Sequence, residues 1–163
     1  MTQIVIEPIT ADAFAPFGDV FDASGAPDKI INMGKCGRYH DRASLDFVDG
    51  KAGISIFNAE VRTLPYDLSL VERHPLGSQA FIPMAMVPFL VIVAPDENGR
   101  PGTPRAFMTQ AGQGINFHCG TWHGVLTPLH EPGLFAVVDR IGDGANLEEF
   151  FFDQPYVVVA QYI

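Results

Sequence analysis

The side chains that could transfer protons or bind a metal ion are concentrated in three short segments of the sequence. These segments cover residues 32–41, 72–79 and 116–123, and together they hold four of the five histidines. Imidazoles, carboxylates and guanidinium groups are the groups that catalyse proton transfer, bind divalent ions and neutralise anionic substrates. The clustering therefore predicts one polar site assembled from three parts of the chain.

The middle segment contains a carboxylate and an imidazole one residue apart. Glu72 and His74 share the parity of an extended strand, so both side chains should point to one face and Arg73 to the other. We expect Arg73 in a salt bridge that is structural or lies between subunits. Gln79 follows a turn at residues 75–77, and a hairpin would bring it alongside Glu72 and His74.

This spacing resembles the first sequence motif of the cupins, in which two histidines one residue apart are followed by a glutamate. Glu72 stands at the position of the first histidine, His74 keeps the second, and Gln79 replaces the glutamate. The third segment resembles the second cupin motif through Gly120 and His123. The resemblance implies that His74 and His123 meet inside a barrel.

The third segment contains further groups beside His123. His118 stands where the second cupin motif usually has proline, and Trp122 should form a packed wall next to the site. Cys119 lies beside His118, but adjacent residues on a strand point to opposite faces, so a catalytic Cys119–His118 pair is not expected. The two cysteines, Cys36 and Cys119, form no CxxC pattern, and we expect both to be reduced thiols.

The sequence predicts a mainly β chain, because thirteen Pro and sixteen Gly separate short apolar runs. We predict a cupin-like β-barrel or double-sheet jelly roll with a few short helices, forming a single catalytic domain over residues 1–163. One short helix should begin after Thr10 and end before Pro16 and Gly18. Residues 94–102 read as an exposed hairpin connection, and residues 146–150 as either a short helix or an irregular loop. The predicted strands cover residues 4–6, 20–22, 54–59, 68–72, 79–83, 89–93, 106–109, 114–117, 134–139 and 156–161.

The charge and hydropathy of the chain exclude several classes of partner. Nineteen acidic and ten basic residues give a net charge of −9, which disfavours nucleic acid. No run approaches the roughly 20 apolar residues of a membrane span, and no secretory signal is visible, so we expect a cytoplasmic protein without a membrane partner. An anionic substrate would need local arginines in so acidic a protein.

Longer strings of the sequence resemble the ureidoglycolate lyases (ureidoglycolate hydrolases) in the same order along the chain. That resemblance implies a cupin-like homodimer that acts in allantoin breakdown, a branch of purine metabolism, in some cases with a divalent metal. The implied reaction converts (S)-ureidoglycolate to glyoxylate and urea. The strings are residues 13–20, 38–41, 72–84, the set Asn116, His118, Trp122 and His123, and residues 139–140.

Ureidoglycolate carries a hydroxyl, a carboxylate and a urea nitrogen on one carbon, so its cleavage is an acid/base-assisted C–N elimination. We assign the catalytic groups to His74, His123 and Glu72. Nickel, zinc or manganese could be held by these three residues with Gln79, or the same residues could form a metal-free acid/base set. No organic cofactor is required. The substrate-binding residues are predicted to be Arg38, Tyr39, His40, Asn32 and His118.

Other functions and contacts are also compatible with the sequence. A metal-dependent cupin oxygenase or isomerase, or a non-catalytic cupin that binds a small molecule, would use the same scaffold. Arg140 could form an ion pair with Asp139. Phenylalanines 150–152 should leave at least one ring pointing outward, which favours a homodimer that buries it.

Overall fold

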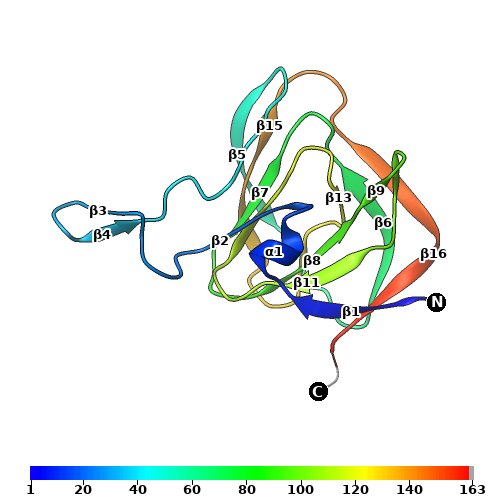
Figure 1. Ribbon diagram of the computed structural model, residues 1–163. Helices are drawn as coiled ribbons and strands as arrows, with labels where there is room; N and C mark the ends of the chain where they lie inside the picture. Colours follow the sequence, from blue (N-terminus) through cyan, green and yellow to red (C-terminus); the bar gives the residue numbers. More distant parts are fainter. Residues whose placement is uncertain (162–163) are drawn as a thin grey trace.

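Two β-sheets make up most of the molecule, and the computed structural model describes residues 1–161 (Figure 1). The seven-stranded sheet has the order β11-β1-β16-β6-β13-β8-β14 and the five-stranded sheet the order β2-β12-β7-β15-β5. In the first sheet the bounds are β11 (Arg105–Met108), β1 (Gln3–Pro8), β16 (Glu148–Val159), β6 (Tyr66–Arg73), β13 (Trp122–His123), β8 (Phe89–Ala94) and β14 (Thr127–Pro128). In the second they are β2 (Gly18–Phe21), β12 (Gly114–Phe117), β7 (Gln79–Pro83), β15 (Leu134–Ile141) and β5 (Lys51–Asn58).

Six strands of the larger sheet close into a ring because β11 pairs with both β1 and β8. One apolar cluster draws on all six ring strands and includes Leu90, Ile92 and Trp122. A second cluster, which includes Val91 and Phe117, lies between β8, β11 and the five-stranded sheet. The expectation of a mainly β, cupin-like barrel is therefore confirmed.

Strand β8 serves both apolar clusters. Leu90 and Ile92 belong to the ring cluster, whereas Phe89, Val91 and Val93 belong to the cluster between the sheets. All six residues of β8 are buried, so its sequence is continuously apolar instead of alternating.

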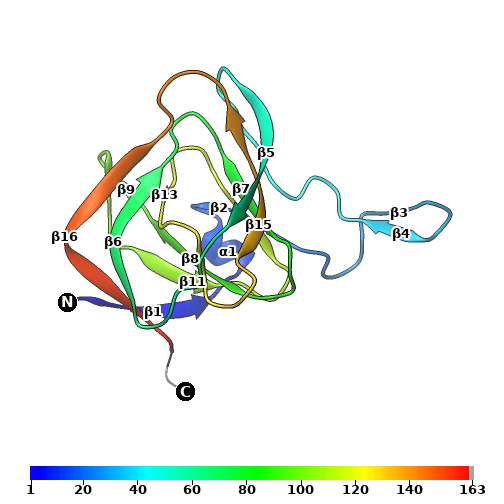
Figure 2. The same cartoon turned by 180° about the vertical axis from the view of Figure 1, so that it is seen from behind.

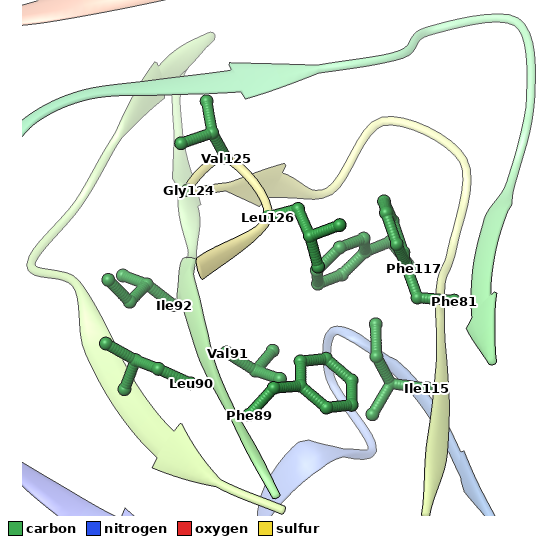
Figure 3. A pocket seen from close by; sticks show the side chains of 10 residues that line it. All are labelled: Phe81, Phe89, Leu90, Val91, Ile92, Ile115, Phe117, Gly124, Val125 and Leu126. Carbon is green, nitrogen blue, oxygen red and sulfur yellow. The ribbon is translucent and has the colours of Figure 1, made fainter. Parts of the chain in front are cut away.

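The apolar layer between the sheets is almost filled by side chains. Phe81, Phe117 and Leu126 are among the residues around a cavity of about 10 Å³, drawn in Figure 3. A space of that size accommodates at most about one water molecule. This part of the layer therefore has no room for a small-molecule ligand.

Local sequence signals are mostly confirmed in the connections. Helix α1 (Ala11–Phe14) begins after Thr10, whose hydroxyl accepts a hydrogen bond from the Ala13 amide at 3.1 Å. The predicted loop at 94–102 is a hairpin of β9 (Asp96–Glu97) and β10 (Arg100–Pro101). Within residues 1–161, no helix has the length and apolar character needed to cross a membrane.

Two predictions near the C-terminus need correction. Residues 148–150 are neither helix nor loop but the beginning of β16. The predicted strand at 156–161 is only the second half of β16, which ends at Val159 and changes register between Phe151 and Tyr156. The short strands β13 and β14 were also missed, because two-residue strands carry no periodic signal.

The predicted hairpin between the Glu72 and Gln79 strands is wrong. Strand β6 pairs with β13 and β16, whereas β7 pairs with β12 and β15, so the two strands belong to different sheets. The turn after Arg73 carries the chain across from one layer to the other. Gln79 consequently approaches the rim from the opposite sheet.

A hairpin of β3 (Lys29–Ile31) and β4 (Cys36–Arg38) projects from the body of the molecule (Figures 1 and 2). The chain leaves β2 to form it and returns to β5. In both views it lies on the far side of β7 and β15 from β6 and β13. We call residues 29–42 the arm.

Candidate active site

Glu72, His74 and His123 converge at the rim of the layer between the sheets. Strand β13 pairs with β6 so that His123 lies opposite Glu72, and His74 follows the end of β6. One ligand atom from each residue lies within 4.8 Å of the others. Glu72 Oε1 is 4.0 Å from His74 Nε2, and the two imidazole centroids are 5.3 Å apart.

Hydrogen bonds define the tautomer of both imidazoles. His74 Nδ1 lies 2.7 Å from the Asn146 carbonyl oxygen, and His123 Nδ1 lies 2.9 Å from that of Gly124. A carbonyl oxygen only accepts, so each Nδ1 carries the proton and donates it. In a neutral imidazole with this hydrogen bond the lone pair lies on Nε2, and both Nε2 atoms are buried without a hydrogen-bond partner within residues 1–161.

Burial keeps His123 neutral. It lowers the pKa of His123 to about 3, with nearby His74 acting in the same direction and the Gly124 carbonyl opposing it. The ring stacks on Phe117, with centroids 4.1 Å apart and planes 4° from parallel. An imidazole of such low basicity is suited to metal ligation or hydrogen bonding rather than to removing a proton at neutral pH.

Glu72 is shifted toward the protonated form. Burial raises its pKa, the negative charge of Glu149 raises it further, and His74 partly offsets both. Glu149 is the register partner of Glu72 on β16, so the two carboxylates lie side by side. A carboxyl group with a raised pKa is a better proton acceptor than an exposed carboxylate and can return the proton that it takes.

The three residues fit a divalent metal ion. Histidine ligands usually donate the other ring N–H to a carbonyl or carboxylate, as His74 and His123 do here. Two neutral imidazole nitrogens with one carboxylate suit ions such as nickel and zinc. The charge of such an ion would also offset the cost of burying Glu72.

Gln79 lies on β7 in the facing sheet. Its amide nitrogen donates to Asp139 Oδ2 at 3.1 Å, and its buried Oε1 has no partner within the described chain. Gln79 pairs in register with Phe117, the residue that stacks on His123. Its amide oxygen is a weak potential ligand at this rim.

The predicted substrate-binding residues of the first segment lie elsewhere. Asn32 and Arg38 lie on the arm with exposed side chains, and His40 is at its base. Tyr39 donates its hydroxyl proton to the Gly25 carbonyl at 2.8 Å, and the His40 amide donates to Asp28. The structure does not bring these residues to Glu72, His74 and His123 of the same chain.

His118 belongs to a second polar cluster beside the first. Its Nε2 is 3.2 Å from Asp19 Oδ2, which also accepts from the Asn116 amide and the Ser44 backbone. Although burial acts to raise the pKa of Asp19, these hydrogen bonds and His118 lower it overall. This cluster ties the base of the arm to β2 and β12.

The arginines nearest in sequence to the site residues have structural partners. Arg73 binds Glu148 and Asp96 at 2.6 and 2.8 Å and lies over the Trp122 ring, so the predicted salt bridge is confirmed. The possible Arg140–Asp139 ion pair does not form within the described residues, and Asp139 accepts from Gln79 instead. Arg140 instead donates to three backbone carbonyls, those of Val48, Asp49 and Asp143.

Asn146 was missed as a site residue. Its carbonyl orients His74, and its side-chain oxygen accepts from the Leu76 amide at 2.7 Å. About 70 residues separate it from His74 in the sequence, and the local sequence contains no signal of that contact. Only the folding of the 142–147 connection over the 74–76 turn places it there.

Comparison with known proteins identifies a family. The family model described as ureidoglycolate lyase matches residues 1–159. A ureidoglycolate lyase of Rhodobacter capsulatus is 59% identical over 159 residues, covering 97% of this chain and 99% of that protein. One from Chelativorans sp. is 54% identical, with 97% of each chain covered. Ureidoglycolate lyase 2 of Rhizobium meliloti is 51% identical, covering 97% of this chain and 98% of the relative.

His123 should make the metal-free protein sensitive to acid. With a folded pKa of about 3 and an unfolded value near 6.5, only the unfolded state binds this proton between those limits. The contribution is therefore lost as pH falls below about 6.5, by roughly 2 kcal/mol at pH 5. Urea unfolding of chelated protein at pH 7 and pH 5 should show this loss, and His123→Gln should reduce it. An equal loss in both proteins would contradict a neutral, buried His123.

Proposed function

Because the chain belongs to the ureidoglycolate lyase family, we propose that it cleaves (S)-ureidoglycolate to glyoxylate and urea at Glu72, His74 and His123. One observation carries the assignment of the site: two buried Nε2 atoms without hydrogen-bond partners lie close to a carboxyl group of raised pKa. Buried polar atoms without partners are costly in a structural role. Their convergence is explained if they bind a ligand.

The reaction moves one proton from oxygen to nitrogen. The substrate hydroxyl loses its proton, its C–O bond becomes a carbonyl, and the electrons of the C–N bond leave with the urea nitrogen. Glu72 takes the hydroxyl proton on a carboxylate oxygen and returns it to that nitrogen. No atom is oxidised or reduced, and no covalent intermediate with the protein is needed.

We also propose a divalent ion at this site, with nickel, zinc or manganese as candidates. His74 and His123 would hold it through Nε2 and Glu72 through one carboxylate oxygen, which leaves the other Glu72 oxygen for the proton, with Gln79 Oε1 as a weaker fourth ligand. When bound, such an ion supplies Lewis acidity that lowers the pKa of the substrate hydroxyl. His74 and His123 are then ligands and not bases, in keeping with the low pKa of His123.

The substrate carboxylate requires a cation that Arg73 and Arg140 do not offer. We assign this role to Arg38, whose planar guanidinium can bind a carboxylate through two hydrogen bonds. Tyr39, His40, Asn32 and His118 would provide further polar contacts. We further propose that residues 1–163 form one catalytic domain of a cytoplasmic homodimer that acts in allantoin degradation.

Incubation of the purified protein with racemic ureidoglycolate in the absence of oxygen tests the function. Glyoxylate and urea should form in equal amounts. If the enzyme accepts only one enantiomer, at most half of the racemic substrate should be converted. Release of ammonia instead of urea would indicate hydrolysis. Absence of glyoxylate and urea in the presence of added nickel, zinc or manganese would overturn the lyase assignment.

Removal of the metal tests the ligand set. Prolonged chelation should abolish turnover, and nickel or manganese should restore it. His74→Ala and His123→Ala should each lower both the bound metal, measured by elemental analysis, and the rate. Cys119→Ser is the matched control, because its thiol lies near the His74 and Pro75 carbonyls and has no assigned role. A histidine variant that loses rate but keeps stoichiometric metal would identify a proton-transfer group instead.

Arg38→Lys tests carboxylate binding with the charge kept. Lysine cannot reproduce the two parallel hydrogen bonds. Transition-state binding should therefore weaken by about 1.5–3 kcal/mol, which lowers kcat/KM roughly 10- to 150-fold. Arg62→Lys, a change on a residue with no role in the site, is the control. Steady-state kinetics that leave kcat/KM of the Arg38 variant unchanged would remove this residue from the site.

A further inference from the structure

The arm is a well-defined hairpin that lacks a core of its own. Lys29–Ile31 pairs with Cys36–Arg38, and the turn is closed by a hydrogen bond from the Lys35 amide to the Asn32 carbonyl at 3.2 Å. Asp28 fixes the base by accepting from the His40 amide and the Arg42 guanidinium. Yet Ile30 is 61% exposed and Met33 at the tip 96% exposed. An ordered, projecting hairpin with apolar side chains is suited to packing on another surface.

The charge of the arm differs from that of the rest of the chain. Residues 29–42 contain four of the ten basic residues and one of the nineteen acidic residues. The remainder is therefore even more acidic than the net charge of −9 indicates. A basic arm is attracted to the acidic body of another copy, which favours self-association through the arm.

The outer face of the five-stranded sheet carries an apolar patch. Ile54 and Ile56 on β5 are exposed, Ile54 by 76%. Val138 and Ala136 on β15 are their register partners, and Ile82 on β7 is paired with Ala136. Ile54 and Val138 form one row across the sheet, and Ile56, Ala136 and Ile82 form the adjacent row. Contiguous apolar rows on the outside of a sheet usually mark a contact with another protein.

The arm emerges beside this patch. Residues 44–46, which come directly after the arm, pass over the outside of β12 and β7, since Asn116 donates to the Ser44 carbonyl and the Asp46 amide donates to Ser78. Figures 1 and 2 show the arm extending outward from this side of the molecule. Another copy seated on the patch would therefore lie within the span of the arm.

The site itself lacks a cation for a carboxylate. Arg73 is bound to two carboxylates and Arg140 to three carbonyls. Arg38 makes no ion pair within residues 1–161 and lies on the arm, far from its own β6 and β13. The Arg38 guanidinium and the proposed site are thus in different parts of the same chain.

We propose that two copies associate through the Ile54/Ile56 patch and that the arm of each places Arg38 in the active site of the other. This proposal rests on the proposed function, which creates the need for a carboxylate-binding cation. A twofold interface makes the exchange reciprocal, so each dimer has two complete sites and an isolated chain has none. The protons are moved at Glu72 of one copy, and the substrate carboxylate is held by the partner's Arg38.

Mixed dimers test the exchange directly. Arg38→Ala and Glu72→Gln chains with different affinity tags are coexpressed, and dimers that carry both tags are isolated. Each variant alone should lose at least tenfold in activity on ureidoglycolate. In the mixed dimer, one site combines both substitutions and the other has neither. Its activity should therefore be about half that of the tagged wild-type dimer.

Three results would overturn the proposal. The first is a mixed dimer no more active than its parents, which would mean that Arg38 serves its own chain. The second is a failure to isolate dimers with both tags. The third is full activity of Arg38→Ala alone. If instead the wild-type protein does not cleave ureidoglycolate, the proposed function fails, and this outcome is distinct from all three.

A charge placed in the patch tests the interface independently of activity. Ile54→Asp should shift the mass measured by light scattering from dimer to monomer and lower activity. Phe151→Asp is the matched control, because Phe151 is also exposed, by 64%, on β16 outside the patch. The control should remain dimeric and active. Dissociation by Phe151→Asp but not by Ile54→Asp would place the interface on β16 and contradict the proposed face.

Discussion

The two-residue strand β13 joins β8 to β6, and both the ring and the candidate site depend on that junction. His123 pairs with Val93 on one side and with Glu72 on the other. Trp122, the neighbouring residue, packs into the ring cluster, and its indole donates to Asp96 at 2.9 Å. Because adjacent residues of a strand point to opposite faces, anchoring Trp122 inside the ring directs His123 toward the layer between the sheets. Closure of the ring and placement of the imidazole are therefore one structural event.

Burial then determines the chemistry available at the rim. It keeps His123 neutral and raises the pKa of Glu72, while carbonyl acceptors fix both imidazoles with Nε2 free. The unpaired Nε2 atoms lower the stability of the folded chain, since buried polar atoms without partners are unfavourable. The filled apolar layer beneath supports them by restricting ring movement, as the Phe117 stack on His123 illustrates. The site thus combines an apolar floor with buried polar atoms that have no hydrogen-bond partner within the described residues.

The strongly acidic character of the chain makes binding of an anion a separate problem. The arginines next to the site residues in sequence are used for structure: Arg73 links β6 to β16 and to the β9–β10 hairpin, and Arg140 holds three carbonyls of nearby connections. Basic charge is instead concentrated on the arm, with Arg38 exposed. The candidate catalytic side chains and this concentration of basic charge consequently lie in two different structural units of the chain.

The sequence alone determined the features that local rules govern. The Pro- and Gly-punctuated apolar runs identified the β class, Thr10 marked the start of α1, and residue type and spacing selected Glu72, His74 and His123. Tertiary structure decided which sheet each strand joins, as for Gln79 on β7, and turned residues 148–150 into the beginning of β16. It also supplied the Asn146 carbonyl to His74 and directed Arg140 to backbone carbonyls instead of Asp139. Strand parity and capping act over a few residues and are visible in sequence. Contacts between residues far apart in the chain depend on how whole layers pack, and no short-range pattern encodes them.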